Sequence, residues 1–168
     1  MGDGLYANHT GNQLERTVRD LFSGAGFALM RYRDYAAQQG GLIEELTEGD
    51  LLLEDVPYTS IYGHSGKTEF LALSKRLGMN MRIECKWQQS SGSVDEKLPY
   101  LYLNCLEAMP EDQILIVIDG EGFKPGAKNW LRQAVEDRRY RNRANDHKQI
   151  RVQNLVEFIT WANGALRA

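Results

Sequence analysis

The chain has 168 residues, of which 42% are hydrophobic and 26% charged, the composition of an ordinary water-soluble globular protein. Its length favours one domain over residues 1–168, and the lack of a basic start followed by an apolar run argues against a signal peptide or membrane span, so a cytoplasmic location is expected. The two cysteines, Cys85 and Cys105, have no C-x-x-C spacing, which argues against a structural zinc site or a disulfide framework.

A net charge of −3 does not by itself indicate a protein that binds nucleic acid. The charges are unevenly distributed, however, because 15 of the 20 Lys and Arg residues follow residue 70. A site that binds a divalent cation is itself acidic before the metal is present. The local distribution of charge is therefore more informative about nucleic-acid binding than the net charge of the whole chain.

A first helix is predicted over residues 12–23, with Thr10 and Gln13 as a capping box at its start. Its apolar residues repeat at the spacing of one buried helix face: Leu14, Val18, Leu21 and Phe22. Glu15 lies at the border of this face. It is expected either to point toward a neighbouring pair of strands or to form an ion pair with Arg19, four residues later.

Residues 26–32 are apolar enough for a strand, and residues 40–66 form a long acidic and turn-rich segment. Such segments are typically functional or mobile. Tyr62 and the following Lys67 are expected to contact nucleic acid, by stacking and by charge. The alternative is a surface loop with its aromatic residues packed down.

Two extended segments, residues 68–73 and 79–86, flank a turn and predict an antiparallel hairpin. Side chains alternate across a strand, so Glu84 and Lys86 share one face while Ile83 and Cys85 share the other. The start of the first strand lies beside the end of the second in such a hairpin. Glu69 is therefore expected to meet Glu84 and Lys86.

These three residue types supply what metal-assisted phosphodiester hydrolysis needs. Mg²⁺ in proteins binds one or two carboxylates and keeps several water ligands, and the attacking water needs a cationic or basic group nearby. Glu69 and Glu84 provide the first requirement and Lys86 the second. The alternative for the E-x-K triplet alone is a surface salt bridge.

The second half of the chain predicts helices and strands in alternation. A helix capped by Ser93 and Glu96 runs to about Ala108, unless Pro99 moves its start or kinks it. The nearly continuous apolar run of residues 113–119 is typical of a central strand, and a helix over 127–136, a short strand over 150–153 and a final helix from residue 154 follow.

Several polar residues in this half are expected to serve the site or the substrate. Gln88 is expected beside the metal and Lys97 at a phosphate, although both are equally explained as solvent-facing groups. A dense basic tract suits phosphate contacts and, with its interleaved tyrosine, base stacking; its cations are Arg138, Arg139, Arg141 and Arg143. The alternative is a solvated arginine-rich loop.

A helix carrying Glu15, then Glu69, then Glu84-Cys85-Lys86 resembles the PD-(D/E)XK nuclease superfamily. The similarity covers about residues 10–135, and residues 92–100 are similar to the segment after this motif in restriction-like and phage-borne members. Glu69 departs from the pattern, because the family more often has Asp there with a preceding Pro. The resemblance implies an α/β fold with a restriction-endonuclease-like core, in which helices flank a mixed central sheet on both faces.

The resemblance also implies a Mg²⁺-dependent DNA endonuclease in which Mn²⁺ can substitute. Glu69, Glu84 and the Cys85 carbonyl would bind the metal, Lys86 would orient or deprotonate the water, and Glu15 would act in an outer position or on a second metal. The alternatives are a junction-resolving nuclease, a catalytically silent DNA-binding module and, less favoured, an inhibitor or toxin-related protein. A homodimer is expected where both DNA strands are cut.

Overall fold

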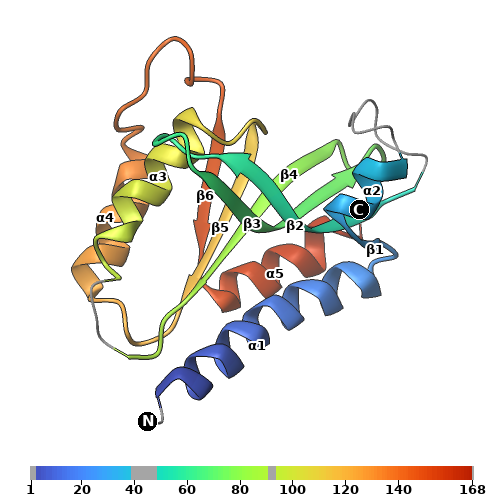
Figure 1. The fold of residues 1–168 in the computed structure, drawn as a ribbon, viewed down its shortest axis with the longest axis horizontal. Helices are drawn as coiled ribbons and strands as arrows, with labels where there is room; N and C mark the ends of the chain where they lie inside the picture. Colours follow the sequence, from blue (N-terminus) through green and yellow to red (C-terminus); the bar gives the residue numbers. More distant parts are fainter. Residues whose placement is uncertain (1–2, 39–48, 91–93, 168) are drawn as a thin grey trace.

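The computed structural model describes residues 3–38, 49–90 and 94–167 and contains a six-stranded mixed sheet in the order β1-β2-β3-β4-β5-β6 (Figure 1). An antiparallel meander forms its centre, made of β2 (Leu51–Thr59), β3 (Ser65–Ser74) and β4 (Met79–Trp87). The remaining strands pair in parallel: β1 (Ala28–Arg31) with β2, β5 (Gln113–Asp119) with β4, and β6 (Gln149–Gln153) with β5.

Helices cover both faces of this sheet. The helices α1 (Asp3–Gly24) and α5 (Leu155–Ala165) lie together on one face, and α3 (Lys97–Glu107) and α4 (Pro125–Glu136) lie on the other, while the short α2 (Tyr32–Gln38) packs near β2 (Figure 1). The predicted α/β fold with a mixed, doubly covered sheet is confirmed. Among the described helices, none has the length and apolar character needed to cross a bilayer.

Alternation along β4 assigns its side chains to the two layers. Ile83 and Cys85 belong to the core beneath α1 and α5. Glu84 lies opposite Ile116 of β5, which belongs to the other core, beneath α3 and α4. Since neighbouring residues in register share a face, Glu84 and Lys86 face the α3 layer. The predicted division of β4 is confirmed.

The first helix differs from its prediction, because it begins at Asp3 and runs through the expected capping box. Thr10 and Gln13 therefore lie inside the helix and do not start it. The third helix also differs: Ser93, its predicted cap, lies outside the described residues, and the helix begins at Lys97 with Pro99 in its first turn. Proline is tolerated there because the first turn has no intrahelical acceptor for its missing N–H.

The prediction of a turn-rich segment over residues 40–66 is wrong for its second half, where β2 is a nine-residue strand. Residues 40–48 lie outside the described part of the chain. Leu52, Leu53 and Val56 are completely buried in β2, so tertiary packing outweighs its acidic residues and its proline.

Candidate active site

The E-x-K segment of β4 forms a tight, buried ion pair. Glu84 is 4% exposed, and its Oε1 pairs closely with the partly buried Nζ of Lys86. Burial lowers the pKa of Lys86, but the Glu84 and Glu69 carboxylates outweigh it and raise that pKa above the ordinary value for lysine. Lys86 is therefore held as a cation by the two neighbouring carboxylates.

The second oxygen of Glu84 has no partner. Glu84 Oε2 is buried and accepts no hydrogen bond from any described residue. A buried carboxylate oxygen without a donor is unfavourable, and such an exception calls for an explanation such as a water or an ion. A cation would satisfy it.

Glu69 lies at the point where the regular pairing of β3 with β4 ends. Their paired register runs as far as Phe70 opposite Ile83. One residue beyond, Glu69 Oε2 accepts a hydrogen bond of 2.7 Å from the backbone N–H of Cys85. The side chain of Glu69 thus replaces the missing backbone partner, which fixes its carboxylate beside β4.

The buried position of Glu69 beside Glu84 opposes the ionisation of Glu69. Burial, and then the charge of Glu84, raise the pKa of Glu69 to about 7, against the effect of Lys86 and of the Cys85 N–H. Like charges at one site raise a pKa in this way, and a bound cation relieves the repulsion. The pair is therefore electrostatically suited to bind a cation.

The contribution of Cys85 comes from its backbone. Burial raises the pKa of the Cys85 thiol well above its ordinary value, so the sulfur stays neutral within the core. The N–H and C=O of one strand residue point toward the same neighbouring strand. The Cys85 carbonyl therefore points toward β3, on the side where Glu69 lies.

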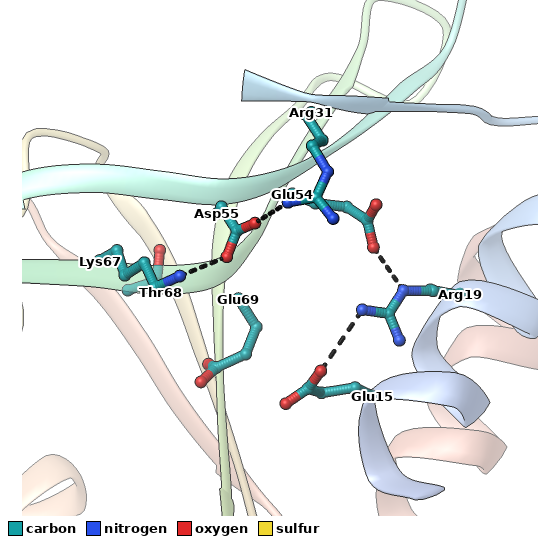
Figure 2. A pocket seen from close by; sticks show the side chains of 8 residues that line it. All are labelled: Glu15, Arg19, Arg31, Glu54, Asp55, Lys67, Thr68 and Glu69. Carbon is teal, nitrogen blue, oxygen red and sulfur yellow. Dashed lines mark hydrogen bonds and ion pairs between the residues drawn. The ribbon is translucent and has the colours of Figure 1, made fainter. Parts of the chain in front are cut away.

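On the α1 side, Glu15 faces Glu69 across a cavity of about 570 Å³ (Figure 2). Burial, and then the charge of Glu69, raise the pKa of Glu15, while Arg19 opposes this rise. The cavity is lined by charged and polar side chains: Glu15, Arg19, Arg31, Glu54, Asp55, Lys67, Thr68 and Glu69. Glu84 and Lys86 are not among them, so Glu69 lies between the α1 cavity and the ion pair on the α3 side.

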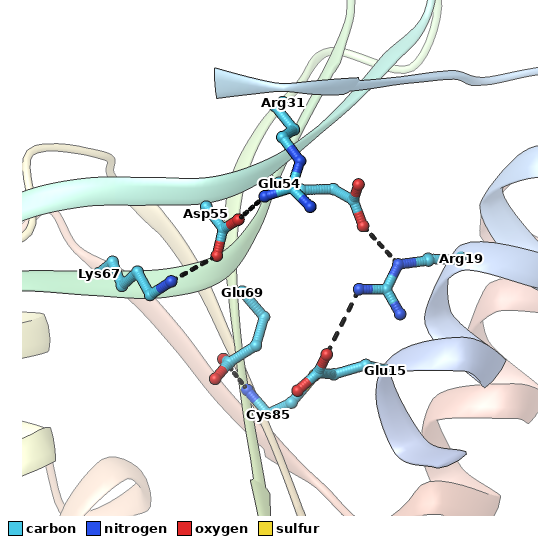
Figure 3. A network of polar contacts seen from close by, with 8 residues as sticks. All are labelled: Glu15, Arg19, Arg31, Glu54, Asp55, Lys67, Glu69 and Cys85. Carbon is cyan, nitrogen blue, oxygen red and sulfur yellow. Dashed lines mark hydrogen bonds and ion pairs between the residues drawn. The ribbon is translucent and has the colours of Figure 1, made fainter. Parts of the chain in front are cut away.

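A chain of ion pairs surrounds this cavity (Figure 3). Arg19 lies 3.3 Å from Glu15 and pairs closely with Glu54, so both predicted environments of Glu15, the salt bridge and the site, coexist. Asp55 accepts hydrogen bonds from Arg31 at 2.8 Å and from Lys67 at 2.6 Å. Glu54 was not expected in this network, because only the folded sheet brings it to Arg19.

Asp55 adopts a left-handed backbone conformation, with a φ of 57°. Left-handed residues inside strands are uncommon for side chains other than glycine, and they cluster at functional sites. The reversal interrupts the alternation of β2, so that consecutive Glu54 and Asp55 both line the cavity. No local signal in the sequence would have predicted this.

The donor set fits a hard divalent cation. No group of three or more His, Cys, Asp or Glu side chains in the described ranges is arranged to hold a metal ion. Mg²⁺, however, takes one or two carboxylates and fills its other positions with water and oxygen ligands. Glu69, the unpartnered oxygen of Glu84 and the Cys85 carbonyl would supply such a set.

Gln88 lies in the loop after β4, and its side-chain amide contacts a neighbouring residue of that loop. Its Nε2 donates to the Ser90 carbonyl at 2.7 Å. Its backbone N–H donates to the Asp119 carbonyl, and its own carbonyl accepts from Gly122. Gln88 therefore joins two loops at the end of the sheet.

The residues predicted to bind DNA are distributed over separate places. Lys67 lies in the cavity, Lys97 is exposed at the start of α3, and Tyr62 is exposed at the hairpin tip. The basic tract is not an array of unpaired cations: Arg138 pairs with Asp146, Arg139 with Asp137, and Arg141 donates to the carbonyls of Asn145 and Lys148. Arg143 is exposed. Three of the four arginines thus stabilise their own loop.

A family model described as a PD-(D/E)XK nuclease superfamily domain matches residues 6–166. Neither a curated protein nor a solved structure matches the chain. The matched range includes α1, the β3–β4 hairpin and α5, which together contain Glu15, Glu69, Glu84 and Lys86. Such a match implies a nuclease, a hydrolase that acts on nucleic acid, and nucleases of this kind typically use divalent metal ions. The chain belongs to the PD-(D/E)XK nuclease superfamily.

Proposed function

We propose that this protein is a Mg²⁺-dependent endonuclease that hydrolyses phosphodiester bonds in DNA. The observation that carries the proposal is the buried Glu84, which pairs with Lys86 through one oxygen and keeps the other without a donor. Glu69 is fixed beside it by the Cys85 N–H. Burying Glu84 and Lys86 in the sheet lowers the stability of the fold, and a role in metal binding and catalysis explains why these charged residues are nevertheless present there.

Each residue has a role that follows from its surroundings. Glu69, Glu84 and the Cys85 carbonyl would hold the Mg²⁺, and Mn²⁺ would occupy the same ligands. When bound, such an ion supplies Lewis-acid stabilisation of a phosphate and a water of lowered pKa. Lys86, held as a cation, neutralises the negative charge that develops on the phosphate and orients the water by donating hydrogen bonds. Glu15 holds a further water in the α1 cavity.

DNA would contact both sides of this site. Lys67, which lies in the cavity, would leave its ion pair with Asp55 and bind a phosphate of the substrate instead. Lys97 and Arg143 are exposed cations that would bind further phosphates. The charges of Arg138, Arg139 and Arg141 contribute at longer range, because these side chains are already engaged. A homodimer would place two sites on the two strands of a duplex.

The test is metal-dependent nicking of a supercoiled plasmid, measured with Mg²⁺, with Mn²⁺ and with EDTA. Lys86→Met should lower the nicking rate by roughly a hundredfold or more, the size of effect found when one charge-stabilising donor is removed. Lys75→Met is the matched control, since Lys75 is exposed at the turn at the other end of the β3–β4 hairpin. Equal nicking by both variants would refute the proposal. Retained plasmid binding without nicking by the wild-type protein would instead favour a silent binding module.

A further inference from the structure

Two tyrosines, one exposed and one half-buried, form a stacked pair where the tip of the β2–β3 hairpin reaches α3 (Figure 1). Tyr62, at the tip, is 68% exposed. Its ring stacks on that of Tyr100 in α3, with centroids 4.9 Å apart and planes 24° apart. His64 approaches Tyr62 edge-on, with the ring centroids 6.2 Å apart. We refer to Tyr62 and Tyr100 as the tyrosine platform.

The platform is rigid. The N–H of Ile61 donates to Asn104 Oδ1 at 2.9 Å, which ties the hairpin tip to α3. Asn104 is completely buried, and its Nδ2 donates to the Tyr100 carbonyl at 2.9 Å. One side chain therefore holds both segments that carry the rings. A ligand that stacks on Tyr62 would therefore lose little binding free energy to the conformational entropy of ordering the two rings.

The platform lies on the same side of the sheet as the Glu84–Lys86 pair. Tyr58, four residues before Tyr62, packs against the core beneath α3 and α4. Burial, and then the charges of Glu84 and Tyr100, raise the pKa of Tyr58, so it lies within electrostatic reach of both the site and the platform. The α1 cavity, by contrast, belongs to the opposite side.

The chemistry of the platform matches one kind of ligand. Lys97 is exposed three residues before Tyr100, so it lies on the same face of α3. A cation beside an exposed aromatic ring, here that of Tyr62, is the arrangement that binds the backbone and bases of single-stranded nucleic acid. In a duplex, the faces of the bases are covered by their neighbours. Away from the duplex ends, only an unpaired or extruded base can stack on a protein ring.

We propose that the tyrosine platform stacks an unpaired base of the substrate and thereby directs cleavage to DNA in which a single-stranded segment adjoins a duplex. This inference rests on the proposed nuclease function and narrows its substrate class. Tyr62 acts as a specificity-determining residue, and the phosphate backbone of the unpaired segment passes Lys97 on its way to Lys86.

The test uses two DNAs with 2-aminopurine at one position, a blunt duplex and the same duplex with a three-nucleotide overhang that carries the probe. Binding is measured with the Lys86→Met protein in Mg²⁺, so that the DNA stays intact. We expect quenching of the overhang probe and tighter binding of that DNA. Adding Tyr62→Ala should weaken binding of the overhang DNA by roughly tenfold or more, the size of one base–aromatic stack, and leave the blunt duplex unchanged.

Two further variants separate stacking from general damage. Tyr62→Phe keeps the ring and should bind the overhang like the parent protein. Val156→Ala removes a side chain of α5 that is 70% exposed, and should have no effect. Equal affinity for the two DNAs, or equal loss in Tyr62→Phe and Tyr62→Ala, would overturn the inference.

The outcomes also distinguish this inference from the proposed function. Wild-type nicking of plasmid, with an overhang preference that Tyr62→Ala does not alter, would keep the nuclease and reject the platform. Overhang binding that depends on Tyr62, with no cleavage of plasmid or of overhang DNA by the wild-type protein in Mg²⁺ or Mn²⁺, would keep the platform and reject the nuclease.

Discussion

Replacing Glu69 by glutamine should make the metal-free protein more stable at alkaline pH. The amide oxygen of glutamine can still accept the hydrogen bond from the Cys85 N–H, so the local backbone contact is kept. The negative charge is lost, and with it the burial of a charged carboxylate and then the repulsion by Glu84, which together raise the pKa of Glu69 to about 7. The substitution therefore isolates the electrostatic cost of the site.

The sign follows from proton linkage. Between its ordinary pKa of 4.5 and a native pKa of about 7, Glu69 keeps a proton in the folded protein that the unfolded chain has released. The folded state is therefore favoured at low pH, and this contribution is lost as the pH rises through that window. At about 1.4 kcal/mol for each pKa unit, the wild-type protein should lose about 2 kcal/mol relative to Glu69→Gln between pH 5 and pH 8.

Urea unfolding in EDTA at pH 5 and pH 8 measures this difference. Glu107→Gln is the control, since Glu107 is an exposed glutamate at the end of α3 and should show no such gain. Mg²⁺ should stabilise the wild-type protein at pH 8 and stabilise Glu69→Gln much less, because a ligand is lost. If the difference in unfolding free energy between wild type and Glu69→Gln were the same at both pH values, the argument for a raised pKa of Glu69 in the folded protein would be refuted.

Three further substitutions test how the fold supports the site. Arg82→Met leaves the buried Glu111 without its ion-pair partner and should cost about 3–5 kcal/mol in urea unfolding, much of which the double variant Arg82→Met with Glu111→Leu should recover. Gly120→Ala should lower the unfolding free energy by roughly 1–3 kcal/mol and reduce plasmid nicking. Gly120 has a φ of 102°, and a Cβ there would lie 2.1 Å from the Gln88 carbonyl oxygen. Gly126→Ala is the control and should be neutral in both assays, because a Cβ at Gly126 would meet no neighbour within 4 Å. Asn154→Ala removes the capping box of α5 and should lower the unfolding free energy by about 1 kcal/mol.

The parts of the fold that the sequence predicted are those with a local pattern. Alternation in β4 assigned Glu84 and Ile83 to opposite layers, and the apolar run of β5 marked a strand covered on both faces. The hairpin geometry then placed Glu69 near the end of β4, where it bonds to the Cys85 N–H. These arguments need only the period of a strand and the length of a turn.

The features that escaped prediction depend on distant contacts. β2 reads as a loop because Glu54, Asp55 and Pro57 interrupt its apolar pattern, and only packing against β1 and β3 makes it a central strand. The left-handed Asp55 and the pairing of Arg19 with Glu54, 35 residues apart, have no local signature. Composition likewise could not show that Arg138, Arg139 and Arg141 of the basic tract have partners in their own loop.

The state of Lys86 limits the chemistry that it can perform. A lysine that serves as a base must lose its proton near neutral pH, and burial alone would favour that loss. Here the adjacent Glu84 and Glu69 reverse the effect and raise the pKa of Lys86. A bound metal would reduce part of this negative charge, but the close ion pair of Lys86 uses the same Glu84 carboxylate that, in the proposed site, would hold the metal. In the proposed reaction Lys86 would therefore act by its charge and its hydrogen bonds. The proton of the attacking water would pass to solvent or to another carboxylate acting as a base, for which Glu15, facing Glu69 across an open cavity, is the available neighbour.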